Sequence, residues 1–321
     1  DTPANGAFSI RHSTRNFPNR EGSKIQNGQL SSVALMDARS IAATAANKGF
    51  LTPATEFDTE FSGKKYFFDK GIYEKRVYDS KGVAHPEVDI QFGPNIKDWP
   101  AMKELSDDLL VKVVSEIHDP VTTTDELIPS GETSSFRSNP LGLAEFTLSR
   151  RDPSYVGKAK AVRDLTDEVK AEVENVAKAF DAKYADMAGR VSKAGLGSTI
   201  FAVKPGDGSA REQAASCQKV LGGWANIANE YATKRYRSNL INWGMLPFIY
   251  KDGDKNLPFA NDDYVFVPNV KKMITDKLST TKAYAIKKDG TITEFELTMG
   301  DLTDDERKII LAGCLINYYR G

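Results

Sequence analysis

Residues 200–223 read IFAVKPGDGSAREQAASCQKVLGG, and the pattern of this stretch decides the fold class. An apolar run over 199–203 passes into a turn rich in proline and glycine, after which alanine and valine recur at helical spacing. The pattern predicts a strand, a tight loop and the start of a helix. Glycines let backbone N–H groups approach a ligand closely, and a helix N-terminus favours an anion. The loop is therefore a candidate anion-binding site.

Ser209 has two interpretations in this loop. Glu212 follows three residues later, which is the spacing of a capping box, where the hydroxyl accepts a hydrogen bond from the backbone and has no further role. In the alternative, Ser209 and Arg211 lie at the mouth of the anion site and act on a ligand. The local pattern leaves both open.

Composition and charge bound the function classes. The 321 residues are 40% hydrophobic and 27% charged, which is typical of a soluble globular protein large enough for two domains. Lys and Arg number 43 against 44 Asp and Glu, so the overall charge attracts neither nucleic acid nor an anionic membrane. Any anion is therefore expected to meet local arginines.

The chain has neither a long apolar run nor a leader-like start, so we expect a cytoplasmic protein without a membrane span. It does not begin with Met, which favours a piece of a longer polypeptide. Cys217 and Cys314 lie too far apart in sequence to form a CxxC site. Two cysteines are also too few for a disulfide framework. Both are expected to be reduced core residues.

Periodicity and turn residues predict an α/β fold. In the first part, we expect a helix over 30–45 capped by Ser31 or Ser32, short strands or a hairpin over 59–88, and a linker over 92–100. The elements expected after the linker are a strand ending at 117, a polar segment without helix over 118–143, an amphipathic helix over 165–191, a helix ending at Gly244, strands over 264–267 and 282–296, and a closing helix over 303–319 capped by Thr303 with Glu306.

Three separate segments each place arginine beside hydroxyl, amide or glycine residues: TRNFPNR at 14–20, SSFRSN at 134–139 and GDGSARE at 206–212. An arginine fork fits both oxygens of a carboxylate, and a small polycarboxylate would need several such forks. The segments therefore predict a carboxylate ligand. By contrast, Arg150 and Arg151 are expected to be solvated or structural, and Lys234, Arg235 and Arg237 to form a charged helix face. The three histidines show no metal-ligand spacing.

In order along the chain stand TRNF at 14–17, TTDELI at 123–128, FR at 136–137, GSARE at 208–212 and a block ending NLINWGMLPF at 239–248. Together they resemble the aconitase superfamily of iron–sulfur hydro-lyases, and within it most closely the bacterial aconitases or hydratases. The resemblance implies that residues 1–104 are the end of the third, cluster-bearing domain with its linker. Residues 105–321 would be the swivel domain, with three layers (β/β/α).

The resemblance also implies roles for single residues. Ser209 matches the serine that moves the proton next to a carboxylate, Arg211 the arginine beside it, and Asp125 the aspartate of the TTD segment. Arg15, Arg20 and Arg137 match arginines that hold substrate carboxylates. The implied activity is hydration or dehydration of a small di- or tricarboxylate such as citrate or isocitrate, as in the tricarboxylic acid cycle.

Departures from the family pattern limit these implications. The second serine of the loop is Ala210, and the histidine expected after the aspartate is Glu126. The family holds a 4Fe–4S cluster through three cysteines that this chain does not match. The cluster is therefore expected in upstream domains, and the chain alone is expected to be inactive.

Two alternatives remain open. In the first alternative, the chain is a non-catalytic swivel subunit or binding module that assembles with a separate cluster-bearing chain. In the second, it is an RNA-binding relative of such enzymes. The near-neutral charge argues against RNA. An upstream coding sequence with the CxxC pair in the same reading frame would favour the single enzyme.

Overall fold

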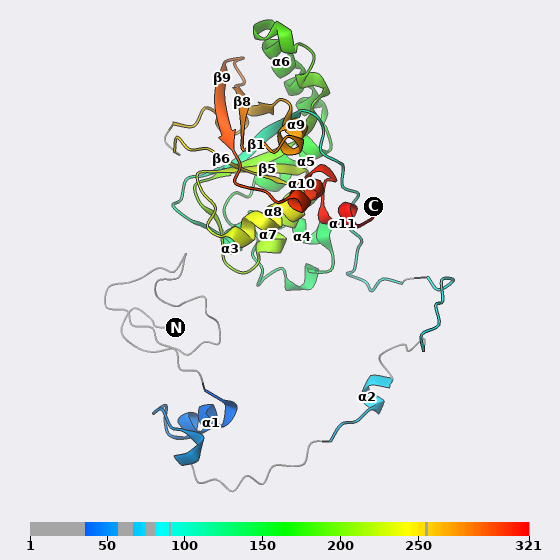
Figure 1. Ribbon diagram of the computed structural model, residues 1–321, viewed down its shortest axis with the longest axis vertical. Helices are drawn as coiled ribbons and strands as arrows, with labels where there is room; N and C mark the ends of the chain where they lie inside the picture. The colour runs from blue at the N-terminus through cyan, green and yellow to red at the C-terminus, as the bar shows by residue number, and fades with distance from the viewer. Residues whose placement is uncertain (1–35, 57–66, 75–80, 90, 254–255, 321) are drawn as a thin grey trace. The chain divides into compact units, whose positions relative to one another are not determined.

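The computed structural model describes residues 36–56, 67–74, 81–89, 91–253 and 256–320 (Figure 1). Described residues up to 91 belong to one compact unit, and those from 92 onward belong to another. The proposed division at 104 between an upstream domain and a swivel domain stays a prediction.

The first unit holds the short helices α1 (Ala38–Ala46), η2 (Ala54–Glu56) and α2 (Gly71–Glu74). The carboxylate of Asp37 caps α1 by accepting hydrogen bonds from the backbone N–H groups of Arg39 (2.8 Å) and Ser40 (3.1 Å). The predicted caps Ser31 and Ser32 lie outside the described residues, and α1 begins where Asp37 provides the acceptor.

The prediction of strands over 59–88 is wrong for the residues of that range that the structure describes. These residues contain α2 and turns but no strand. The Asp69 carboxylate accepts a hydrogen bond from the backbone N–H of Gly71 at 2.9 Å. This contact starts a helical turn in place of an extended strand.

The second unit is built on a closed barrel in the order β1-β3-β5-β6-β9-β8-β7. Its strands are β1 (Leu109–Ile117), β3 (Gly195–Ala202), β5 (Gly223–Ala228), β6 (Leu246–Ile249), β7 (Tyr264–Val267), β8 (Thr280–Ile286) and β9 (Ile292–Thr298). β1, β3, β5 and β6 are parallel, whereas β7, β8 and β9 are antiparallel. The α/β class is confirmed, and the two expected strand layers are the two sides of one barrel.

Successive residues of β1 point to opposite faces of the sheet, and because most of them are apolar and buried, this strand contributes to several cores. Val111 and Val113 join the cluster inside the barrel, to which each barrel strand contributes, while Leu110 packs outside it beneath a helix. A register shift between Val113 and Ser115 then changes which side chains face inward. Beyond it, Ile117 packs against the helices on the parallel side.

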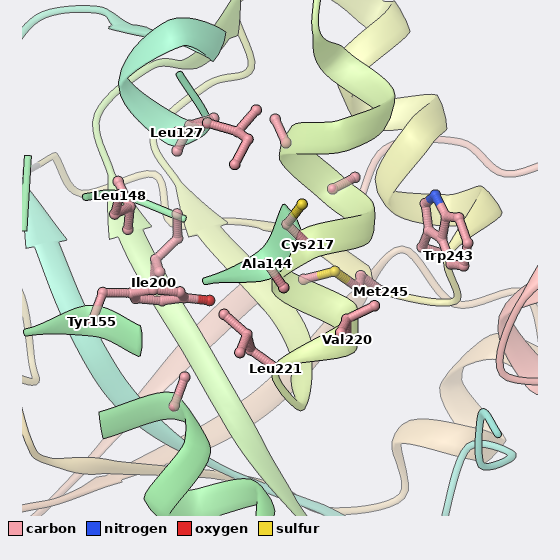
Figure 2. Close-up of a cluster of buried hydrophobic side chains, with 14 of the residues drawn as sticks. Leu127, Ala144, Leu148, Tyr155, Ile200, Cys217, Val220, Leu221, Trp243 and Met245 are labelled. Carbon is pink, nitrogen blue, oxygen red and sulfur yellow. The ribbon is translucent and has the colours of Figure 1, made fainter. Parts of the chain in front are cut away.

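Helices cover the outside of the barrel on two sides (Figure 1). The helices on the parallel side are α3 (Thr124–Leu127), α4 (Pro140–Ala144), α5 (Tyr155–Arg163), α7 (Arg211–Val220) and α8 (Lys234–Asn242). Figure 2 shows part of their shared core, formed by Leu127, Ala144, Leu148, Tyr155, Ile200, Cys217, Val220, Leu221, Trp243 and Met245. This core supports the loop that precedes α7. As predicted, Cys217 and Cys314 are free and buried.

On another side, α6 (Asp167–Lys183) packs Val176 and Phe180 over the barrel. It is shorter than the predicted helix over 165–191. Tyr184 ends it, and the short turns η4 (Ala185–Met187) and η5 (Val191–Lys193) follow. Gly189 adopts φ +74° and donates its backbone N–H to the Asp181 carboxylate at 3.0 Å, so the chain turns back instead of continuing the helix.

The segment 118–143 was predicted to lack helix, and this prediction is wrong. Besides α3 and α4 it contains η3 (Ser134–Phe136). Thr123 and Glu126 form a capping box for α3, while Asn139 caps α4 and Pro140 takes its first position. The Thr, Asn and Pro residues that suggested a loop therefore begin short helices.

The C-terminal elements follow the prediction with one break. Helix α9 (Val270–Thr275) follows β7, and the hairpin β8–β9 turns at Asp289 and Gly290. The capping box of Thr303 and Glu306 starts α10 (Asp304–Leu311) as predicted. Gly313, at φ +88°, then separates α10 from α11 (Leu315–Arg320). A Cβ atom at Gly313 would lie 1.9 Å from the carbonyl oxygen of Lys103, so this position requires glycine both for its backbone angle and for space.

Candidate active site at the loop before helix α7

A two-stranded parallel sheet joins the two loops in which the catalytic residues were predicted. β2 (Thr122–Thr123) pairs with β4 (Pro205–Asp207), with Thr122 opposite Pro205 and Thr123 opposite Asp207. The backbone N–H of Thr122 also donates to the carbonyl of Lys204 at 3.0 Å. The pairing brings the loop of Asp125 and the loop of Ser209 together.

Two glycines make this close approach sterically possible. Gly206 has φ +99°, and a Cβ atom there would lie 2.3 Å from the Tyr236 ring. Gly208 has φ +131°, and its Cβ would lie 2.2 Å from Thr124 Oγ1. Glycine is required at both positions by the backbone angle and by the space.

Ser209 is an exposed residue in a bend, and it does not cap the helix. α7 begins at Arg211, its N-cap is Ala210, and no side chain makes a cap hydrogen bond. The capping-box interpretation of Ser209 with Glu212 is therefore wrong. Since Ala210 is the N-cap, Glu212 stands at the second helical position, one short of the position that a capping box requires.

The Glu212 carboxylate instead turns toward the end of α8. Glu212 Oε1 accepts a hydrogen bond from the Trp243 indole Nε1 at 3.1 Å. Burial raises the pKa of Glu212, although hydrogen bonds from Ser216 and Trp243 lower it. Trp243 in turn packs against Trp99, with ring centroids 4.4 Å apart and the ring planes tilted by 41°. The hydrogen bond from Trp243 thus attaches the first turn of α7 to the end of α8. Ser209 is exposed to solvent.

Arg211 is the half-buried first residue of α7. Asp125 is the second residue of α3, and its carboxylate, 56% exposed, forms an ion pair with Arg150 Nη1 at 2.7 Å. The other Nη atom of Arg150 contacts Glu132 at 2.5 Å, and the bonds to Glu132 and Asp125 raise the pKa of Arg150. Arg150 is therefore structural, as predicted, and it holds the carboxylate that the motif assigned to the site.

Glu126, where the resemblance led us to expect a histidine, has a structural role in α3. Its Oε2 accepts hydrogen bonds from the Thr123 backbone N–H at 2.7 Å and from the Thr123 hydroxyl at 2.8 Å. The carboxylate is used to cap α3.

Arg137 is exposed at the end of η3, and among the described residues it has no ion-pair partner. Its loop is attached to the preceding segment, since Ser138 accepts a hydrogen bond from Lys97 at 2.9 Å and Asn139 donates one to Asn95 at 3.1 Å. α4, which follows, packs on α7. The predicted carboxylate-binding residues Arg15 and Arg20 lie outside the described residues.

Behind the loop lies a buried polar network that sequence analysis did not identify. The Tyr236 hydroxyl accepts hydrogen bonds from Asn226 (2.8 Å) and Gln218 (3.0 Å), and Thr233 donates to the carbonyl of Gly206 at 3.3 Å. The helix that carries Tyr236 was expected to present a charged face, and Arg237 does hydrogen-bond the carbonyls of Gly300 and Asp301. The sequence carries no signal that Tyr236 supports Gly206.

The described residues do not fit an iron–sulfur cluster. They contain no group of three or more His, Cys, Asp or Glu residues placed to hold a metal ion. Cluster ligands are thiolates, whereas burial raises the pKa of Cys217 to about 12. A cluster would therefore need ligands from elsewhere. Within the described part of the chain, no helix is long and apolar enough to cross a membrane.

The family model of the aconitase C-terminal domain matches residues 156–253, a range that includes Ser209, Arg211 and Tyr236. The match supports the predicted place of the chain in the aconitase superfamily, and with it an enzyme of the lyase type. Assignment to the bacterial aconitases stays a prediction.

A comparison with curated proteins finds no match. Among solved structures, the chain is similar to a 3-isopropylmalate dehydratase of Methanocaldococcus jannaschii, at 20% identity and a TM-score of 0.40, over 66% of this chain and 93% of that one. A TM-score this low establishes neither a shared fold nor a shared function.

Proposed function

We propose that the chain is the C-terminal part of an aconitase-type hydro-lyase that adds water to, or removes it from, a small di- or tricarboxylate such as citrate or isocitrate. The observation that carries the proposal is the pairing of β2 with β4, which joins the loops of Asp125 and Ser209 while leaving the Ser209 hydroxyl exposed and free of the helix cap. A hydroxyl that serves as a cap would be less available for proton transfer.

Each residue has a role in this proposal. Ser209 moves the proton at the carbon next to a carboxylate, a task that requires nearby cations and backbone donors because a serine hydroxyl is a weak base. Arg211, at the N-terminus of α7, supplies positive charge beside it, and Arg137 with Arg15 and Arg20 holds the substrate carboxylates. Asp125, held by Arg150, orders the second loop. The 4Fe–4S cluster of such an enzyme would be carried by polypeptide other than the described residues.

The test is turnover by the complete enzyme, or by this chain assembled with a cluster-bearing N-terminal half. Ser209→Ala is expected to remove most of the turnover of citrate or isocitrate without changing the melting temperature. Ser279→Ala, at another exposed serine, is the matched control and should retain turnover. Equal activity of the two variants would exclude Ser209 as the proton-transfer group. Turnover by the 321-residue chain alone would contradict the need for a second half.

A second candidate is a non-catalytic swivel subunit. The residues from 92 onward form their own compact unit with its own cores, which is compatible with a separate subunit. Mixing the chain with a cluster-bearing partner distinguishes the two: a stable complex in which Ser209→Ala leaves turnover unchanged would favour the non-catalytic role.

A further inference from the structure

The first turn of α7 carries an acidic side chain beside the proposed active site. Glu212 is the second residue of the helix, directly after Arg211 and three residues after Ser209. A carboxylate in this turn is attracted to the positive end of its own helix. There it would offset positive charge that a substrate carboxylate needs, and it would repel that substrate. The direction of the Glu212 carboxylate therefore bears on substrate binding.

Two side chains donate hydrogen bonds to this carboxylate, and neither belongs to the loop of Ser209. The Trp243 indole donates from Nε1 to Glu212 Oε1 at 3.1 Å. Ser216, one helical turn further along α7, also hydrogen-bonds the carboxylate. No side chain makes a cap hydrogen bond at the N-terminus of α7, so Glu212 does not cap its own helix. Its charge is engaged by the end of α8 and by the second turn of α7.

Trp243 is a donor with a fixed position. It is 8% exposed and belongs to the core of the parallel side (Figure 2). Trp99 packs against its ring, and its backbone N–H donates to the carbonyls of Asn239 and Leu240, both at 3.1 Å. An indole N–H can only donate. A buried indole held on both sides therefore fixes the place at which the Glu212 carboxylate binds it.

We propose that Trp243 is a positioning residue of the proposed active site: it keeps the negative charge of Glu212 away from the N-terminus of α7, so that a substrate carboxylate can bind beside Ser209 and Arg211. The inference rests on the proposed function, from which it takes a carboxylate ligand at this loop. It adds a role for Trp243, which lies 31 residues from Glu212 along the chain. Trp243 acts through Glu212 and does not touch the substrate.

The experiment titrates citrate into the full chain, labelled with ¹⁵N, at about pH 8, where carboxylates are ionised, and follows the backbone amide of Arg211 by NMR. Glu212→Asp keeps the charge but is shorter by one methylene, so it loses the contact with Trp243. It is expected to weaken citrate binding about two- to fivefold, the size of one charge at a helix end. Glu212→Ala, which removes the charge, should bind citrate at least as tightly as wild type. Glu296→Asp, exposed on β9, is the matched control and should bind as wild type does.

Changes at Trp243 test the same idea from the other helix. Trp243→Phe removes the donor and should weaken citrate binding as Glu212→Asp does, and adding Glu212→Ala to Trp243→Phe should restore it, because the repelling charge is then gone. Trp224→Phe, at a tryptophan that is also 8% exposed, should not change binding. The Glu212 variants decide the question even if Trp243→Phe fails to fold.

Three results overturn the inference. Equal weakening by Glu212→Asp and Glu212→Ala would show that the hydrogen bond matters only for structure. Wild-type affinity of Glu212→Asp would show that the direction of the carboxylate has no effect, and an Arg211 amide that does not respond to citrate would remove the ligand from this loop. Failure of the proposed function is seen separately, since Ser209→Ala with undiminished turnover contradicts the proton transfer and leaves these binding ratios as they are.

Discussion

Gly206 lies against the ring of Tyr236 so closely that a Cβ atom on Gly206 would stand 2.3 Å from Tyr236 Cγ and Cδ1. The contact fixes the loop of Ser209 against α8. It also explains why this position lacks a side chain, and the positive φ of +99° is a second, independent reason for glycine.

Gly206→Ala is expected to destabilise the protein by roughly 2–5 kcal/mol, because an alanine there combines an unfavourable backbone angle with overpacking. Urea denaturation measures the change. Gly157→Ala is the matched control: this glycine lies inside α5 with nothing within 4 Å of its Cβ position, so alanine should stabilise by about 0.5–1 kcal/mol. Equal effects of the two substitutions would contradict the close contact.

Ser209→Ala is expected to leave the free energy of unfolding unchanged within about 0.5 kcal/mol, since the hydroxyl makes no cap hydrogen bond. Thr303→Ala, which removes a formed capping box, should cost about 1 kcal/mol. Thermal denaturation of both variants checks the difference. A loss at Ser209 as large as that at Thr303 would restore the capping interpretation.

Tyr236→Phe is expected to cost about 1–3 kcal/mol, because the hydroxyl accepts hydrogen bonds from Asn226 and Gln218, whose buried amides would lose their acceptor. Tyr319→Phe, at a residue 79% exposed, should have no measurable effect. If Tyr236→Phe unfolds at the same urea concentration as wild type, the network contributes no stability.

Lys219 makes stability depend on pH in a defined window. Its pKa is about 7 in the folded protein and has the ordinary value of 10.5 in the unfolded chain, so the unfolded chain binds more protons between these values. Stability should therefore rise with pH from about 7 to about 10.5, by several kcal/mol in total. Below this window both states hold the proton, and above it neither does.

Lys219→Met removes the buried charge and is expected to be more stable than wild type at about pH 6.5, with a smaller advantage at about pH 9.5. Urea denaturation at both pH values measures the change, and Lys193→Met serves as an exposed-lysine control with no such trend. An advantage of Lys219→Met that is the same at both pH values would show that the charge is not the cause.

The sequence by itself determined the features that depend on neighbouring residues. The apolar, valine-rich run LLVKVVSEI predicted β1, glycine at 244 predicted the end of α8, and Thr303 with Glu306 predicted the start of α10, because such runs and caps act within a few residues. Motif order also placed the chain in a superfamily that the match over 156–253 supports.

Only the tertiary structure decided the role of the Ser209–Glu212 pair. The spacing satisfied the rule for a capping box, but Glu212 hydrogen-bonds Trp243, 31 residues away, and α7 begins after Ala210. The pairing of Thr122 with Pro205 is likewise a long-range contact. Such choices depend on which distant groups compete for the same atoms, and local spacing carries no information about those distant groups.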